Sequence, residues 1–319
     1  MNKKTLGFLA LSLLVFNQAI ASEADTFTRR SEALDDASEI INHKANKAIQ
    51  ASLDAANSKN KDCNEKALYT ELRVYFNNHM KGKLTIDIIH NTDIPKREIG
   101  LAKSVYGNWS PWDGLGMGLG FMKRSKETLA PVVKIEDSII GIDKFEHMFG
   151  QGYFYFQDNY LQNQGTIHAV KMGALREKSI LGGNKLANGV FSYGDLSANF
   201  NGMRMWNHML QKHDDVLGVD QNLGPYITCA DHKWEQVKEI DFRNYIDDSM
   251  DEATNCSKFT SQSTVKKFKN NIKERGFSGC PMDQQKLDDL IIKYGSMSKW
   301  MINEKGTGVV KYFGEFKSK

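Results

Sequence analysis

Apolar residues recur every three or four positions along most of the chain, which is the pattern of amphipathic helices. Residues 25–59 show it clearly, with one apolar face formed by Leu34, Ala37, Ile41, Ala45, Ile49, Leu53 and Ala56. A second helix is predicted over about residues 64–80. Further helices are predicted over about residues 143–162, 166–181, 193–212, 232–253, 259–274 and 283–304. The pattern therefore predicts a mainly α protein.

A change of period separates the N-terminal helices from the main helical block. Leu84, Ile86 and Ile88 alternate with polar residues, which predicts a strand. A second strand is predicted over residues 128–135, where Pro131 confines the first half to a sheet edge. We expect a small β-section over about residues 84–136, in a lysozyme-like arrangement, and a short strand near residues 309–313. The N-terminal helical segment, residues 22–83, is expected to pack on the main domain, residues 84–319, as one unit.

The first 21 residues have the pattern of a secretory signal peptide. Two lysines precede an apolar core at residues 6–16, and an A-x-A cleavage site follows at residues 19–21. The core is too short to span a bilayer, and no later apolar run is long enough. Ser22 rather than a cysteine follows the site, so no lipid anchor is indicated there. We expect a soluble mature protein that is periplasmic or secreted and has no transmembrane segment.

Four cysteines, Cys63, Cys229, Cys256 and Cys280, follow the leader. An even number of cysteines in an oxidising compartment predicts two disulfides, and four cysteines allow three pairings. We favour Cys256–Cys280 with Cys63–Cys229, which would link the N-terminal helices to the C-terminal part. The spacings match neither a zinc ribbon nor a CxxC motif.

The charge balance bears on partners. The 319 residues carry a formal net charge of +3, and two of these charges lie in the leader. This near-neutrality argues against nucleic-acid binding as the main function, because nucleic-acid-binding domains usually carry a marked basic excess.

A glycine-rich segment at residues 114–120 invites comparison with a phosphate-binding loop. It contains neither GxxxxGK[ST] nor a GxGxxG that opens a helix. A strand in which glycines alternate with larger apolar residues describes the segment better. Trp109 and Trp112 precede it and are candidate binding residues for a sugar or another flat ligand. Tryptophans more often pack in the core or at its rim.

Three polar motifs lie between residues 143 and 202. They are Asp143-Lys144-Phe145-Glu146-His147, then Arg176-Glu177-Lys178 ahead of two glycines, then the run from Ser192 to Asn199. If the three predicted helices are neighbours, one polar pocket would contain His147, Glu177, Asp195 and Asn199.

The order of these motifs resembles a group of uncharacterised bacterial envelope proteins, many of them assigned as lipoproteins. That group shares Asp-Lys-x-x-His, then Lys-Glu before a glycine stretch, then Ser-x-x-Asp-Leu-x-x-Asn with a following glycine. The likeness covers residues 143–202 only. This chain has Arg176-Glu177 where Lys-Glu is usual, lacks the lipobox cysteine, and has long extensions on both sides. The resemblance implies an envelope location and no established activity.

Helix capping offers a simpler explanation for several of these residues. Asp143 with Glu146, and Ser192 with Asp195, both have the spacing of a capping box. We favour capping over catalysis for Asp143 and Ser192. For Glu146 and Asp195 the two interpretations are evenly balanced, because a capping acid can also face a pocket. Histidines outside the motifs, such as His79, are interpreted as surface or hydrogen-bonded core residues.

Three functions are consistent with these motifs. The first is hydrolysis of cell-wall glycan, with peptidoglycan or another envelope glycan as partner. Glu146, flanked by apolar residues, would be the acid whose pKa is raised, and Glu136, Glu177 or Asp195 would be the second carboxylate. His147 and Asn199 would bind in the same pocket. No cofactor is required for this chemistry.

The other two functions use the same residues differently. In a non-enzymatic envelope protein, the polar cluster would fix the packing of three helices through Asp143–His147 and Asp195–Asn199 hydrogen bonds. A metal-dependent hydrolase would use His147 with Glu177 and Asp195. The sequence contains neither HExxH nor HxH, so we expect no metal site.

Overall fold

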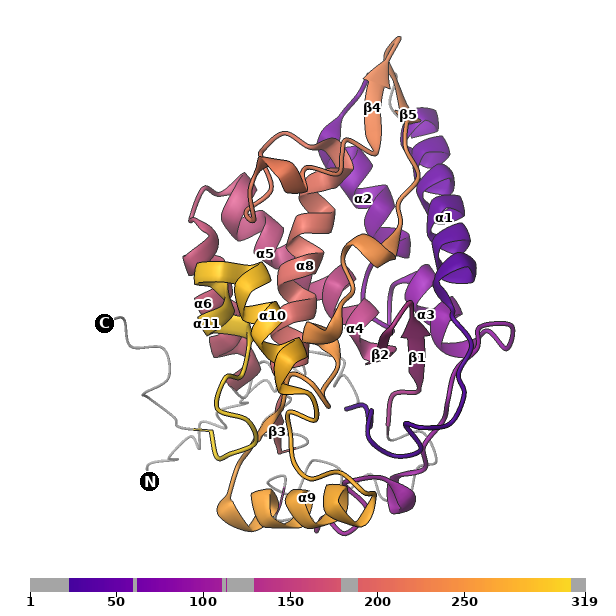
Figure 1. Cartoon of the computed structure of the whole chain (residues 1–319). Coiled ribbons are helices and arrows are strands. Elements are labelled where there is room, and N and C mark those ends of the chain that lie inside the picture. Colours follow the sequence, from indigo (N-terminus) through magenta and orange to yellow (C-terminus); the bar gives the residue numbers. More distant parts are fainter. Residues whose placement is uncertain (1–22, 60–61, 111–112, 114–128, 179–188, 311–319) are drawn as a thin grey trace, which may run out of the picture.

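The computed structural model describes residues 23–59, 62–110, 113, 129–178 and 189–310 (Figure 1). Its α-helices are α1 (Ser38–Lys59), α2 (Glu65–Tyr75), α3 (Lys83–His90), α4 (Asp143–Glu146), α5 (Gly152–Phe156), α6 (Thr166–Lys178), α8 (Tyr193–Leu210), α9 (Gln262–Glu274), α10 (Gln284–Tyr294) and α11 (Ser298–Met301). Two π-helical turns, η4 (His147–Gln151) and η5 (Gln157–Leu161), continue α4 and α5. The 3₁₀ turns are η1 (Leu101–Lys103), η6 (Val219–Gln221), η7 (Phe242–Asn244), η8 (Asp248–Met250) and η9 (Gly295–Met297).

Strands are short and pair in three antiparallel couples. They are β1 (Val132–Ile135) with β2 (Ser138–Gly141), β3 (Val190–Phe191) with β6 (Lys258–Phe259), and β4 (Ile227–Ala230) with β5 (Lys233–Gln236). The registers pair Val132 with Gly141, Val190 with Phe259, and Ile227 with Gln236. The mainly α fold class with a small β content is confirmed.

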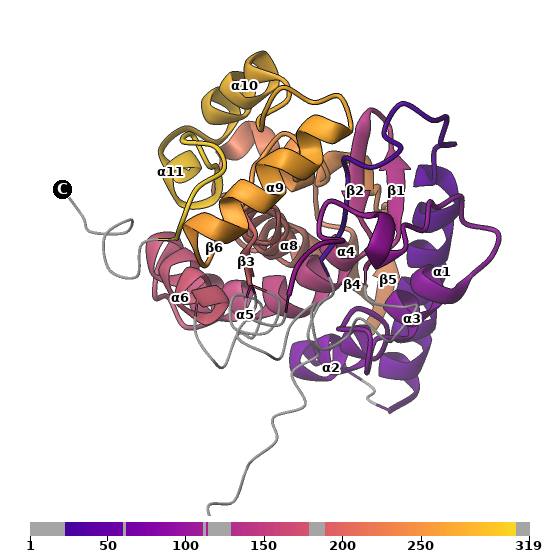
Figure 2. The same ribbon diagram turned by 90° about the horizontal axis from the view of Figure 1, so that it is seen from below.

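Helix α8 runs through the centre of the molecule and is enclosed by other elements. Every residue of α8 except Leu210 is buried. It contacts α4, α5, α6 and α11, while α1 packs against α2 and β5 at one flank (Figures 1 and 2). The main hydrophobic core extends from Ala37 to Val310, so α1 and the end of the described chain share it. A second apolar cluster lies beneath α9 and includes Phe27, Trp109 and Phe268.

Two glycines set the close crossing of α5 and α8. A Cβ built on Gly202 would lie 2.2 Å from the carbonyl oxygen of Met148, and one on Gly152 would lie 2.6 Å from the Cα of Gly202. The Gly152 N–H donates to the His147 carbonyl oxygen, which closes the π turn η4. Because neither glycine carries a side chain, the backbones approach closely and the polar residues on both helices face each other.

The predicted strand at residues 84–88 is wrong, because this segment forms α3. Leu84 and Ile88 are four residues apart and both are buried on one helix face, while Ile86 is 37% exposed. Alternation over five residues cannot be distinguished from a short amphipathic helix. The strand predicted over residues 128–135 exists as β1, and it begins at Val132, after Pro131.

The helix predicted over residues 232–253 is also wrong. This segment contains β5 and then the 3₁₀ turns η7 and η8. The Asp241 carboxylate accepts from the Arg243 N–H, and the Asp247 carboxylate accepts from the Ser249 N–H. Such local side-chain bonds compete with helix formation, so the apolar spacing did not produce a helix.

Both predicted disulfides are confirmed. Cys63–Cys229 joins the loop before α2 to β4, across 166 residues of sequence, and Cys256–Cys280 closes a loop of 24 residues. Val309 forms a bridge with Phe259, and the remainder of the predicted tail strand lies outside the described residues. Among the described helices, none has the length and apolarity needed to cross a bilayer.

Candidate functional site

The ammonium group of Lys144 is the centre of a buried cluster of charged side chains. Its Nζ lies 2.7 Å from Asp143 Oδ2, 2.7 Å from Asp195 Oδ1 and 2.8 Å from Glu252 Oε1. The side chain of Lys144 is 0% exposed. Its three hydrogen-bond donors are therefore matched by three carboxylates, which belong to α4, α8 and the segment after η8. A buried ammonium requires such a shell because charge is costly to remove from water.

His147 follows Lys144 by one helical turn and extends the cluster. Its Nδ1 lies 3.0 Å from Asn199 Oδ1, and its Nε2 lies 3.2 Å from Asp195 Oδ2. Both ring nitrogens thus face oxygen acceptors, an arrangement that the doubly protonated imidazolium satisfies. Burial opposes the charge on the ring, but the Asp195 carboxylate outweighs it and raises the pKa of His147 to about 10.

Carboxyl groups outnumber the cations of the cluster. Asp143, Asp195 and Glu252 contact Lys144, and Glu23 is close enough for its pKa to respond to these charges. Burial raises the pKa of Glu252 to about 7, partly offset by Lys144. Burial also raises the pKa of Asp143 and Glu23, with Lys144 opposing in both cases. Like charges in one low-dielectric site cannot all ionise at neutral pH.

Asp195 differs from its neighbours, because its pKa is lowered. Burial alone would raise it, but His147 and Lys144 together outweigh burial. The position of Asp195 in the first turn of α8 adds the favourable field of a helix N-terminus. The cluster thus contains one carboxylate that stays ionised and others that hold protons more tightly.

Glu177 of α6 approaches the same group from another side. It is 5% exposed, and its charge contributes to the raised pKa of His147. The structure therefore brings together the set predicted from sequence, namely His147, Glu177, Asp195 and Asn199. All four are buried, none more than 5% exposed.

Glu146, the predicted catalytic acid, lies on a different side of the helix. Its Oε2 is 2.6 Å from Nδ1 of His79, a residue that precedes α3. This bond raises the pKa of His79 and exceeds the opposing effect of burial. Glu146 is thus paired with a half-exposed imidazole instead of standing alone among apolar residues. His79, interpreted as an ordinary histidine, is a partner that sequence reasoning missed.

The capping prediction is wrong for Asp143 and confirmed for Ser192. Ile142 stands at the N-cap of α4, where no side chain caps the helix, and Asp143 bonds Lys144 instead. The need of a buried ammonium for carboxylate partners explains this difference. Ser192 Oγ accepts from the Asp195 N–H at 3.1 Å, as a cap does, and donates to Glu252 Oε1 at 3.2 Å.

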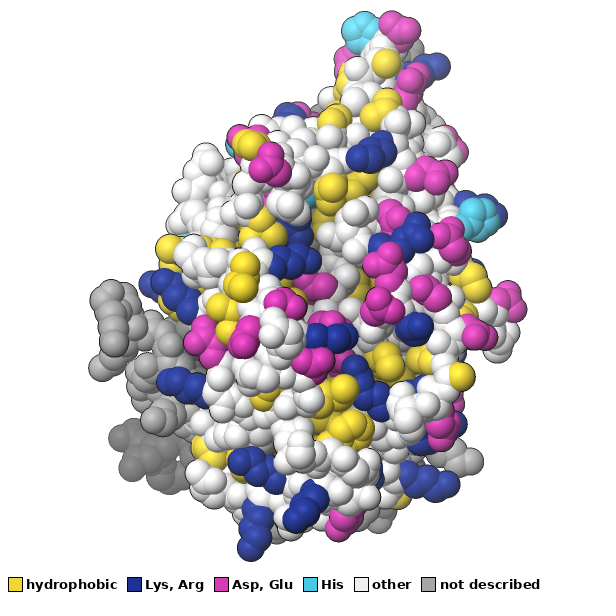
Figure 3. Space-filling view, viewed as in Figure 1, with side chains coloured by type: hydrophobic (Ala, Val, Ile, Leu, Met, Phe, Trp, Pro, Cys, Tyr) yellow, Lys and Arg dark blue, Asp and Glu magenta, His cyan; other side chains and the backbone are white. Residues whose placement is uncertain are grey.

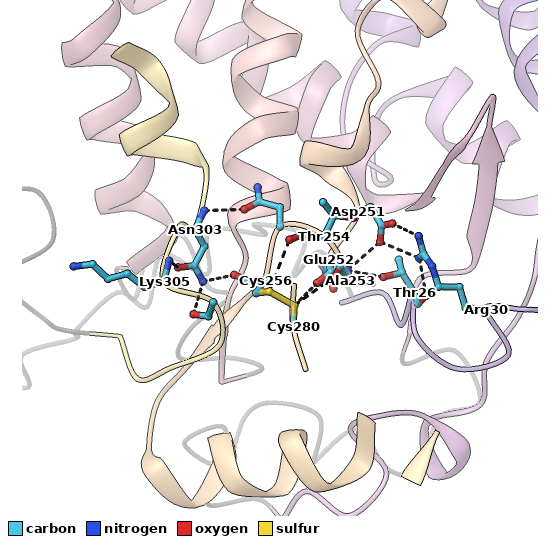
Figure 4. Close-up of a disulfide and its surroundings, with 12 residues drawn as sticks. Thr26, Arg30, Asp251, Glu252, Ala253, Thr254, Cys256, Cys280, Asn303 and Lys305 are labelled. Carbon is cyan, nitrogen blue, oxygen red and sulfur yellow. Dashed lines mark hydrogen bonds and ion pairs between the residues drawn. A yellow bond between two sulfur atoms is a disulfide. The ribbon is translucent and has the colours of Figure 1, made fainter. Parts of the chain in front are cut away.

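The segment that carries Glu252 is held by several independent contacts. Asp251 pairs with Arg30, whose Nη1 lies 3.2 Å from Asp251 Oδ1. The next residues lead into Cys256, whose disulfide with Cys280 lies beside this segment (Figure 4). Glu252 and Glu23 were not predicted as site residues. Each belongs to a segment without a recognisable motif. Only the tertiary structure brings Glu252 into contact with Lys144 and places Glu23 within the electrostatic influence of Lys144.

The tryptophan candidates do not form a described groove. Trp109 is 3% exposed and packs edge-on against Tyr106 and Phe259, so it is a core residue. Trp112 and the glycines of residues 114–120 lie outside the described residues.

A metal could be considered at the cluster, since Asp143, His147 and Asp195 each place a ligand atom within 4.8 Å of the others. Two of these three residues already bind the Lys144 ammonium, and His147 faces two acceptors. Lys144 thus provides the cation that this donor set neutralises.

Comparison with protein-family models, curated proteins and solved structures finds no match to this chain.

Proposed function

We propose that this chain is an exported protein of the bacterial envelope that acts by binding, with the Lys144 cluster as its structural centre. The single observation that carries the proposal is the enclosure of Lys144, whose fully buried ammonium has three carboxylate partners, two of them from distant parts of the chain. The groups of the cluster are buried and form no open cleft, so a polymeric glycan would bind elsewhere on the surface and not at the cluster itself. Their geometry suits a role in fixing α4, α8 and the Glu252 segment relative to one another.

Export is supported by three independent features. The leader has the order of a signal peptide, with a cleavage site at residues 19–21. Residues 23–28, the first that the structure describes after that site, are all buried. Two disulfides account for all four cysteines, as is usual in oxidising compartments. The resemblance of residues 143–202 to envelope proteins agrees with the same location, and peptidoglycan is the partner that we propose.

Cosedimentation with purified peptidoglycan sacculi tests this function. We expect the purified chain to pellet with sacculi and to release no soluble fragments. Lys144→Met should lower the free energy of unfolding by about 3–5 kcal/mol, because it leaves buried carboxylates without their cation. Lys266→Met is the matched control, since Lys266 is exposed on α9. Failure to pellet, or a Lys144→Met protein as stable as the control, would contradict the proposal.

A second candidate is hydrolysis of peptidoglycan, which would require the buried cluster to open to the polymer, and one observation favours it. Glu252 and Asp195 contact the same Lys144 ammonium, yet the pKa of Glu252 is raised to about 7 and that of Asp195 is lowered. Carboxyl groups with separated pKa values are typical of an acid and base pair. Fragment release from sacculi by wild type, lost in a Glu252→Gln variant that still unfolds cooperatively, would establish this candidate in place of the first.

A further inference from the structure

A separate cavity lies between α9 and the two loops at residues 278–280 and 305–307. Its volume is about 310 Å³. Helix α9 and both loops contribute to its lining, which includes Lys269, Asn270, Lys273, Ser278, Lys305 and Thr307. Figure 4 shows the Cys256–Cys280 disulfide and Lys305 above α9, the helix that supplies the other two lysines.

The cavity is strongly cationic. Three lysines line it, and none of its lining residues is acidic. Lys269, Lys273 and Lys305 are exposed and form no ion pair with the part of the chain that the structure describes. Lys267, on the neighbouring face of α9, is neutralised by Asp113 at 2.6 Å. Basic side chains gather at this end of the molecule, over α9 (Figure 3).

Neutral hydrogen-bond donors complement the charge. The hydroxyl oxygen of Thr307 is covered from solvent and has no hydrogen-bond partner among the described residues. Ser278 and Asn270 add a hydroxyl and an amide at the same cavity. A phosphate group accepts several hydrogen bonds at once and carries up to two negative charges, so it matches three ammonium groups better than a single carboxylate does.

We propose that this cavity binds a phosphate group. A volume of about 310 Å³ exceeds a single phosphate, so the group would be carried by a larger molecule, such as a phosphorylated envelope polymer or a lipid headgroup. The cavity shares no lining residue with the Lys144 cluster, so this site is independent of the function proposed for the cluster.

Calorimetric titration of the purified chain with inorganic phosphate at low ionic strength tests the site. We expect saturable binding of one equivalent, weakened about tenfold or more by the double substitution Lys269→Gln and Lys273→Gln. The matched control is Lys266→Gln with Lys299→Gln, two lysines that do not line the cavity. Both pairs include exposed positions, and circular dichroism verifies that each variant folds.

Vesicles with and without phosphatidylglycerol distinguish the carrier. If the protein binds the anionic vesicles and inorganic phosphate competes with this binding, the phosphate group belongs to a lipid headgroup. Phosphate binding without vesicle binding would assign it to a phosphate carried by a polymer. Absence of saturable phosphate binding by the folded protein, or an equal loss in the control pair, would overturn the proposal.

Discussion

Gly202 of α8 lies directly against the backbone of Met148, where a Cβ on Gly202 would come within 2.2 Å of the Met148 carbonyl oxygen. Met148 follows His147 directly in the sequence, and Gly202 lies one helical turn after Asn199. It therefore sets the separation at which His147 can meet Asn199 and Asp195. The glycine that follows the third polar motif is thus a spacing residue for the buried cluster.

Substitution Gly202→Ala should force the π turn η4 and α8 apart, because the nearest atoms to the new Cβ belong to the backbone of Met148. We expect a loss of about 1–3 kcal/mol in the free energy of unfolding, the usual cost of overpacking a close contact. Urea denaturation measures it. Gly100→Ala is the control, because Gly100 is exposed, has ordinary backbone angles and would place its Cβ in open space. Equal stability of the two variants would show that the crossing can relax without cost.

The raised pKa of Glu252 predicts a fall in stability between about pH 4.5 and 7. In this window the folded chain holds the Glu252 proton and the unfolded chain does not, so raising the pH favours unfolding. Glu252→Gln cannot titrate, and we expect it to remove this part of the slope, which amounts to a few kcal/mol. Exposed Glu235→Gln should leave the slope unchanged. Urea titrations at several pH values compare the three proteins.

His147 predicts a second loss of stability at alkaline pH. Its folded pKa of about 10 exceeds the ordinary value of 6.5, so the imidazolium stabilises the fold fully below 6.5. That contribution is lost as the pH rises through about 10. We expect His147→Gln to be less stable than wild type at neutral pH. Its free energy of unfolding should also fall less steeply than that of wild type as the pH rises above neutral. An NMR titration of the ring that places its pKa near 6.5 would contradict the imidazolium assignment.

The Cys63–Cys229 disulfide closes the longer of the two loops, 166 residues against 24. Because cross-linking distant residues restricts the unfolded chain, replacing both cysteines by serine should lower the free energy of unfolding by about 2–5 kcal/mol. Thermal unfolding of the double variant measures the loss, with wild type under reducing conditions as a comparison. A variant that unfolds at the wild-type temperature would show that α1 and β5 hold the two parts together without the bond.

Local sequence patterns were sufficient for several elements of the main helical block. The helix from residue 143, helix α8 and its Ser192 cap were all predicted, because helical periodicity and capping act over a few residues. The disulfide pairing was also predicted. The errors at residues 84–88 and 232–253 arose where a short apolar spacing was compatible with more than one structure.

The sequence by itself determined the mainly α fold class, most helices of the main block, the favoured disulfide pairing and the spacing that places Asp143, Lys144 and His147 on one part of a helix. Only the tertiary structure decided that Lys144 is the centre of the site and that Glu252 and Glu23 belong to it. It also separated Glu146, which pairs with His79, from the cluster. The physical reason is that a buried charge selects its partners by proximity in space. Three carboxylates distant in sequence, at residues 143, 195 and 252, lie within 2.8 Å of one ammonium group.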